Sequence, residues 1–195
     1  MEMHPRSGYG INTVSPGGVP MKRVLLMYAR YSKRANESVF RLLDDLSGAA
    51  LNQDRKSHYG SLAGLAAHIV GATLYFQSLF RASSPAAAAA LEASGGLKTP
   101  HDKDLSEEEW LELRRIGTLA DQATIDMIQA LDDEALTVPV KLDWYGGDPE
   151  SVPLCFLAHQ LFVHGTHHRG QVSQILDSMG IEHDFSGIDL EFLPG

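Results

Sequence analysis

Apolar side chains recur every three or four residues over most of the chain from Met21 onward, which is the spacing of one face of an α-helix. The first such stretch predicts a helix over residues 22–46, with Arg and Lys on the opposite face. Its apolar positions are Val24, Leu25, Tyr28, Tyr31, Ala35, Val39, Leu42, Leu43 and Leu46.

A second apolar stripe follows, and Ser57 is predicted to be the N-cap of its helix. The stripe consists of Leu62, Leu65, Ile69, Ala72, Phe76 and Leu79. Ser83, Ser84 and Pro85 indicate where this helix ends. Ala86–Ala90 has high helix propensity and is expected to add a short turn before a loop.

A capping box predicts the start of a third helix, because Ser106 is followed three residues later by Glu109. This helix is expected to continue to Leu131. Two β-rich runs come next, Leu136–Trp144 and Ser151–Leu154, separated by a Gly-Gly turn. They predict a small hairpin.

Pro153 is predicted to be the first residue of a fourth helix that runs to Met179 and ends at Gly180, a typical C-cap glycine. Four helices of about 25 residues predict an all-α fold, an antiparallel four-helix bundle with a small β-hairpin between helices three and four. Residues 1–20 lack periodicity and are rich in Pro and Gly, so they are predicted to be a flexible N-terminal extension of one domain, residues 21–195.

Composition removes several classes of function. A length of 195 residues fits one domain, and 16 Lys and Arg against 25 Asp and Glu give a net charge of −9, which disfavours nucleic acid as a partner. The most apolar stretches are interrupted by histidines, so no membrane helix is expected and the protein is predicted to be cytoplasmic. Cys155 is the single cysteine, which excludes an internal disulfide framework and a Cys-rich zinc site.

Histidine spacing in the fourth predicted helix points to a metal. His164 and His168 lie about 40° apart on one helix face, one turn from each other, and this spacing suits chelation of one ion. His167 with His164 is a second-choice pair, displaced by about 60°. His159 lies about 140° away and is discarded.

The second predicted helix contributes His68, at the border of its apolar stripe. Three neutral imidazoles can hold Zn²⁺ or Ni²⁺ and leave coordination positions open, as catalytic zinc sites do. Gln160 and Gln171 lie on the His164 side of their helix, where they could hydrogen-bond to an imidazole or a metal-bound water. The alternative is that all three histidines are core polar residues that bind no metal.

The remaining candidate groups are interpreted as structural. The metalloprotease motif H-E-x-x-H does not occur in the sequence, which argues against peptidase activity. Solvated positions are expected for Glu107–Glu109, Asp44, Asp45, Arg30 and Arg169, and Cys155 is expected to be a buried small apolar residue.

Three segments closely resemble the DinB-like family of metal-binding four-helix-bundle proteins. They are YSKRANESVFRLLDDL, SHYGSLAGLAAHIVGA and FVHGTHHRGQVSQILDSMGI, in which HHRGQ is the specific element. The resemblance covers Met21 to the C-terminus. It implies that His68, His164 and His168 coordinate a divalent metal ion.

The first predicted helix departs from that family. Members often carry Tyr-Asn-x-Trp-Ala-Asn where this chain has Tyr31, Ser32, Lys33, Arg34, Ala35 and Asn36. Two positions differ, so no role in the site is assigned to this helix. The family name refers to induction by DNA damage and implies no DNA binding, which agrees with the acidic net charge.

The resemblance implies a metal-dependent enzyme and leaves its reaction open between a hydrolase and a transferase that uses a low-molecular-weight thiol. Zinc or nickel is the expected metal, and catalytic and cofactor-binding residues other than the three histidines are unassigned. The alternative is a non-catalytic metal- or ligand-binding stress-response protein. A homodimer is expected from the resemblance, and no small-molecule substrate is identified.

Overall fold

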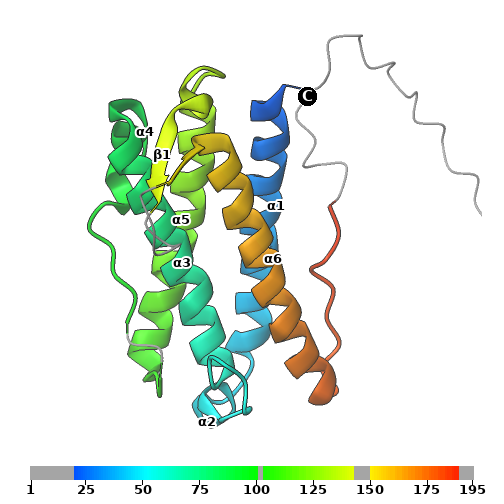
Figure 1. Cartoon of the computed structure of the whole chain (residues 1–195). Coiled ribbons are helices and arrows are strands. Elements are labelled where there is room, and N and C mark those ends of the chain that lie inside the picture. The colour runs from blue at the N-terminus through cyan, green and yellow to red at the C-terminus, as the bar shows by residue number, and fades with distance from the viewer. Residues whose placement is uncertain (1–19, 101–102, 143–149, 189–195) are drawn as a thin grey trace, which may run out of the picture.

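A computed structural model describes residues 20–100, 103–142 and 150–188 (Figure 1). Four long helices dominate it: α1 (Met21–Asp44), α3 (Leu62–Ser83), α5 (Glu107–Ala130) and α6 (Leu154–Ser178). Nearly all of the predicted N-terminal extension and the last seven residues of the predicted domain lie outside the described ranges.

Shorter elements connect the long helices. They are α2 (Gly48–Asn52), α4 (Pro85–Ala90), the 3-10 helices η1 (Glu92–Ser94) and η2 (Ala135–Thr137), and the strands β1 (Pro139–Leu142) and β2 (Glu150–Pro153). The strands are antiparallel, with Pro139 opposite Pro153 and Leu142 opposite Glu150. The prediction of a mainly helical chain with one small hairpin is confirmed, while its Gly-Gly turn lies outside the described residues.

Two predicted helix starts are wrong. Helix α3 begins after Ser61, whose hydroxyl accepts a hydrogen bond from the Gly64 N–H at 3.0 Å, and not after Ser57. Ser57 belongs to a turn closed by Gly60. Gly60 has a φ of 74°, a left-handed conformation that is not helical, so the helix begins after it. Pro153 is the last residue of β2, because it pairs with Pro139, so α6 begins one residue later than predicted.

Two other helix ends agree with prediction. Ser106 and Glu109 form the predicted capping box: the Glu109 N–H donates to the Ser106 hydroxyl, and the Ser106 N–H donates to the Glu109 carboxylate. Gly180 has a φ of 71°, and the N–H of Ile181 donates to the Leu176 carbonyl at 3.0 Å, as in a glycine C-cap.

The four long helices pack so that α1 and α3 each contact both α5 and α6. In Figure 1, α1 and α6 run in one direction and α3 and α5 in the other. The prediction that each helix is antiparallel to the one before it therefore fails for α3 and α5. The segment between them, which includes α4 and η1, returns along the length of the molecule and makes these two helices parallel (Figure 1).

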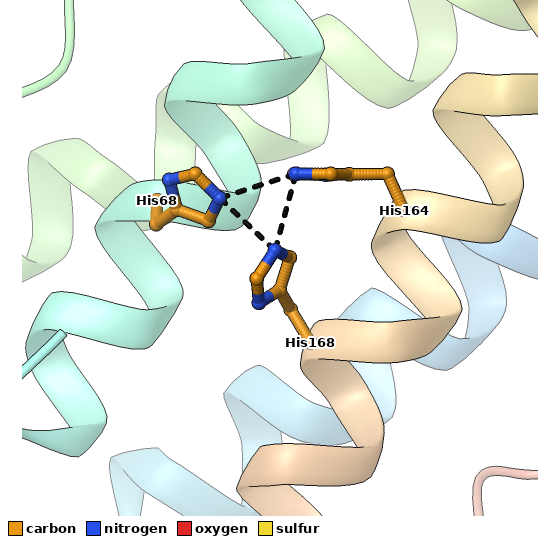
Figure 2. Close-up of side chains that lie close together, drawn as sticks. All are labelled: His68, His164 and His168. Atoms are coloured by element: carbon orange, nitrogen blue, oxygen red, sulfur yellow. Dashed lines mark hydrogen bonds between the residues drawn. The ribbon is translucent and has the colours of Figure 1, made fainter. Parts of the chain in front are cut away.

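Helix α3 supplies much of the core, since most of its residues are buried against the other long helices. By length and composition alone α3 would be able to cross a membrane, which the sequence analysis did not expect. Its burial inside the protein matches the core helix of a globular fold, which passes the same test. The consequence for function is that His68 is held on a core helix, where it is partly buried and points towards α6 (Figure 2).

Candidate metal centre

Three imidazoles from two helices meet at one point. His68 comes from α3, and His164 and His168 come from successive turns of α6 (Figure 2). The Nε2 atom of His68 lies 3.3 Å from that of His164 and 3.1 Å from that of His168, and the latter two atoms are 3.1 Å apart. The structure thus joins all three predicted site residues into one cluster.

The spacing of these nitrogens suits a single metal ion. Tetrahedral coordination with Zn–N bonds of about 2.0–2.1 Å separates ligand nitrogens by about 3.3–3.4 Å. Octahedral coordination with bonds of the same length separates them by about 2.9 Å. The observed separations of 3.1–3.3 Å fall between these values, so one ion can contact all three atoms after shifts of a few tenths of an ångström.

The hydrogen bond between His168 and Gln171 favours a tautomer of His168 that suits metal binding. Nδ1 of His168 lies 2.8 Å from the Gln171 side-chain oxygen, which accepts only, so Nδ1 is the protonated atom and Nε2 has a free lone pair. One lone pair cannot accept two good hydrogen bonds from His68 and His164 at once. Coordination of one cation by the Nε2 lone pairs of the three histidines explains the cluster better than hydrogen bonds among them.

Burial keeps the three imidazoles neutral. It lowers the pKa of His68 to about 4, with further lowering from His168 and His164. Burial is also the main reason why the pKa values of His164 and His168 lie below the usual range. A neutral imidazole is the form that ligates a metal, so the site is ready to bind an ion at neutral pH.

An aromatic side chain that the sequence analysis missed supports the cluster. Tyr59 stacks on His68 with ring centroids 3.9 Å apart and presents its edge to His168 at 5.2 Å. His58 packs in turn against Tyr59. Tyr59 lies in the loop before α3, where no periodic pattern marks it, so only its place two residues before Ser61 in the SHYGS segment hinted at the role.

The other side chains considered around the site have different outcomes. Gln171 orients His168 as predicted, whereas Gln160 is exposed and lines an adjacent pocket. His167 is exposed and outside the cluster, although its ring packs edge-on against His168. His159 is exposed and packs against Tyr28, which agrees with discarding it.

Arg169 corrects a sequence-based expectation, because it is 2% exposed and not solvated. One terminal nitrogen donates to the Asn36 side-chain oxygen at 3.0 Å and the other to the Thr166 hydroxyl at 3.0 Å. Its guanidinium carbon lies 5.3 Å from the centre of the Tyr31 ring. Helix α1, to which no role was assigned, therefore holds the arginine that follows His168.

Asn36 extends this network to α5, since its side-chain N–H₂ donates to both carboxylate oxygens of Asp121, at 2.9 and 3.2 Å. Burial raises the pKa of Asp121 to about 6, against the lowering effects of the Asn36 hydrogen bond and of the Arg169 charge. Both Asp121 and Arg169 were outside the predicted site: Asp121 stands far from the histidines in the sequence, and Arg169, although it follows His168 directly, was expected to be a solvated surface arginine.

The expectation that Asp44 is only solvated also needs correction. Its carboxylate accepts a hydrogen bond from the Trp110 ring N–H at 2.9 Å and forms an ion pair with Arg114. These contacts tie the end of α1 to the start of α5 and lie away from the histidines. Cys155 packs against the core but is only partly buried, whereas it was predicted to be buried.

An open pocket of about 430 Å³ lies beside the histidine cluster. Its lining residues are His68, Gly71, Ala72, Tyr75, Phe76, Gln160 and His164. Two of the three histidines thus border a space large enough for a small molecule, with mainly apolar walls.

These features define a class: a mainly helical protein with a partly buried three-histidine cluster suited to a divalent metal. The chain belongs to the DinB family, whose model matches residues 21–186. The match includes all three histidines and confirms the family resemblance found in the sequence. No curated protein matches the chain.

Proposed function

We propose that this chain is a four-helix-bundle protein that binds one divalent metal ion, zinc or nickel, through His68, His164 and His168, and that it is a metal-dependent enzyme. The observation that carries the proposal is the convergence of three neutral Nε2 atoms within 3.3 Å of one another. Membership of the DinB family supports it.

Catalysis is favoured over a purely structural metal by the ligand set. Structural zinc sites are closed by four protein ligands, whereas catalytic sites keep three and leave a position for water or substrate. In the described part of the chain, the candidate cluster contains no cysteine or carboxylate beside its three histidines. An ion bound there would lie next to the 430 Å³ pocket, because two of its ligands, His68 and His164, line that pocket.

A bound divalent ion would polarise a carbonyl or lower the pKa of a water or a thiol. The protein's own groups position the reactants: Gln171 and Tyr59 hold the ligand rings, and Phe76 and Tyr75 give the pocket apolar walls. Besides the two histidines, Gln160 and Tyr75 carry polar groups among the residues that line the pocket, and the Gln160 amide can orient a substrate carbonyl or hydroxyl. Hydrolysis and transfer to a low-molecular-weight thiol both fit this arrangement.

One observation favours the second candidate function, a non-catalytic metal- or ligand-binding role in a stress response. None of the described residues that line the pocket is a carboxylate, so no general base of that kind stands next to the cluster. Without such a base, turnover requires a nucleophile that is already activated, either a water or thiol on the metal or a group of the substrate itself.

The first experiment measures metal content by plasma mass spectrometry in natively purified protein and in His168→Ala and His167→Ala variants. About one equivalent of zinc or nickel is expected in the parent and in His167→Ala, and almost none in His168→Ala, because His168 belongs to the cluster and His167 does not. His167 is the matched control, since it is the adjacent histidine on the same helix and is exposed. No metal in any of the three, even after incubation with Zn²⁺ or Ni²⁺, contradicts the proposal.

A second experiment separates the candidate functions. The metal-loaded protein is assayed against a panel of ester and amide substrates and against electrophiles with low-molecular-weight thiols. Turnover by the parent and His167→Ala, but not by His168→Ala, supports an enzyme, and the active half of the panel identifies hydrolase or transferase. Full metal occupancy without turnover supports the binding role.

We further propose a cytoplasmic homodimer with no nucleic-acid or membrane partner. The net charge of −9 supports the absence of nucleic acid. Phe156 and Val163 lie seven residues apart on α6 and are 60% and 48% exposed, which leaves apolar surface for a second copy. Light scattering on the purified protein tests the dimer, and a monomer mass at micromolar concentration contradicts it.

A further inference from the structure

A small cavity lies next to the histidine cluster, and His164 is the cluster residue in its lining. Its volume is about 20 Å³, and its polar lining comes from Ser32 and Asn36 on α1, Thr73 on α3, Asp121 and Thr124 on α5, and His164 and Arg169 on α6. A buried water needs at least about 10–15 Å³ of such volume and two to four polar partners. The cavity therefore has room for one water molecule.

Three buried polar atoms belonging to residues that line this cavity have no hydrogen-bond partner among the described residues. They are Oγ of Ser32, Nδ1 of His164 and Nε of Arg169. A buried polar atom without a partner is costly, and structures usually satisfy such atoms with protein groups or ordered water. Their gathering around one cavity from two different helices calls for a common partner.

The donor and acceptor character of these groups matches a water molecule. When Nε2 of His164 offers its lone pair to a metal, Nδ1 carries the proton and donates, and Nε of Arg169 always donates. The Asp121 carboxylate accepts from Asn36 and retains further lone pairs, and the Ser32 hydroxyl can accept as well. A water accepts two hydrogen bonds and donates two, so it can serve both donors and both acceptors.

We propose that this cavity holds one ordered water that accepts from His164 Nδ1 and Arg169 Nε and donates to Asp121 and Ser32. Through this water Asp121 is a positioning residue for the metal ligand His164, in the way that Gln171 directly orients His168. The inference rests on the proposed metal site. It gives α1 and α5, which supply no histidine to the cluster, a role in holding the ligand His164.

Zinc affinity tests the positioning role, measured by competition with a chromophoric chelator. Asp121→Asn is expected to weaken Zn²⁺ binding about tenfold, because partners of metal-ligating histidines contribute about 10- to 100-fold in affinity. Ser32→Ala removes one of two acceptors and is expected to weaken binding less than Asp121→Asn does, because the Asp121 carboxylate still accepts from the water. Asp126→Asn is the matched control: it removes an exposed carboxylate from the same helix and is expected to leave affinity within twofold.

A crystal structure of the zinc-loaded parent tests the water directly, and it is expected to show one water within hydrogen-bond distance of His164 Nδ1. An Asp121→Asn affinity within twofold of the parent, or a cavity without water, overturns the relay while leaving the metal site intact. A parent that binds no zinc overturns both the relay and the proposed function. If Asp121→Asn does not fold, as judged by circular dichroism, Ser32→Ala and the crystal structure decide the outcome.

Discussion

At the scale of single residues, the hydrogen bond from His168 to Gln171 fixes which nitrogen faces the cluster. An imidazole without such a partner is free to rotate and to change tautomer, and both motions compete with metal binding. Each histidine has its own support: Gln171 for His168, the Tyr59 ring for His68, and the polar cavity for His164.

Gln171→Leu is expected to weaken Zn²⁺ binding about tenfold, because His168 loses the acceptor that holds its Nδ1 proton. Gln174→Leu is the control, since it makes the same change at an exposed position of α6. Chelator competition at pH 7.5 measures both. Equal affinities for the two variants would show that Gln171 does not orient the ligand.

At the scale of elements, the spacing between helices is set by small side chains at close contacts. A Cβ atom added to Gly117 on α5 would lie 3.0 Å from a methyl carbon of Val70 on α3 and 3.4 Å from the Phe40 ring on α1. Gly117 thus lets α5 approach both helices, which places Asp121, one turn further along, beside Asn36.

Gly117→Ala is expected to destabilise the fold by about 1–2 kcal/mol, because overpacking costs about 1–3 kcal/mol and outweighs a gain in helix propensity of up to about 1 kcal/mol. Gly170→Ala on α6 has no neighbour within 4 Å of its added Cβ and is expected to stabilise by up to about 1 kcal/mol. Urea unfolding measures both changes. The same sign for the two variants would contradict this account of the packing.

At the scale of the whole molecule, the buried titratable groups make stability depend on pH. The histidines of the cluster have pKa values below those of the unfolded chain, so the unfolded state binds protons first as pH falls. Their stabilisation is present above about pH 6.5 and is lost as pH falls towards the pKa of His68, about 4. Asp121, with its pKa raised to about 6, acts in the opposite direction.

Metal-free protein is therefore expected to lose stability between pH 7 and pH 5, because three histidines outweigh one carboxyl group. His164→Gln is expected to reduce this slope, because it removes one of the titrating imidazoles of the cluster. Urea unfolding at several pH values in the presence of a chelator provides the measurement. A free energy of unfolding that stays constant over this range would contradict the assignment of neutral buried histidines.

The sequence by itself determined the features that depend on neighbouring residues. Helical periodicity indicated the four long helices, the Ser106 and Gly180 caps were predicted correctly, and the i, i+4 spacing placed His164 and His168 on one face. These are local properties, fixed by backbone geometry within one or two turns. Ser57 was mistaken for the cap because two serines, Ser57 and Ser61, precede the apolar stripe, and the turn at Gly60 distinguishes them.

Only the tertiary structure decided how distant segments meet. It aligned α3 parallel to α5, joined His68 to a pair almost a hundred residues away, buried Arg169 against Asn36 and closed a polar cavity next to His164. Helix directions depend on the path of a long connection, and burial of a charged side chain depends on partners from other helices. Neither is encoded in the spacing of residues along one helix, which is why the histidines were predicted and the network that supports them was not.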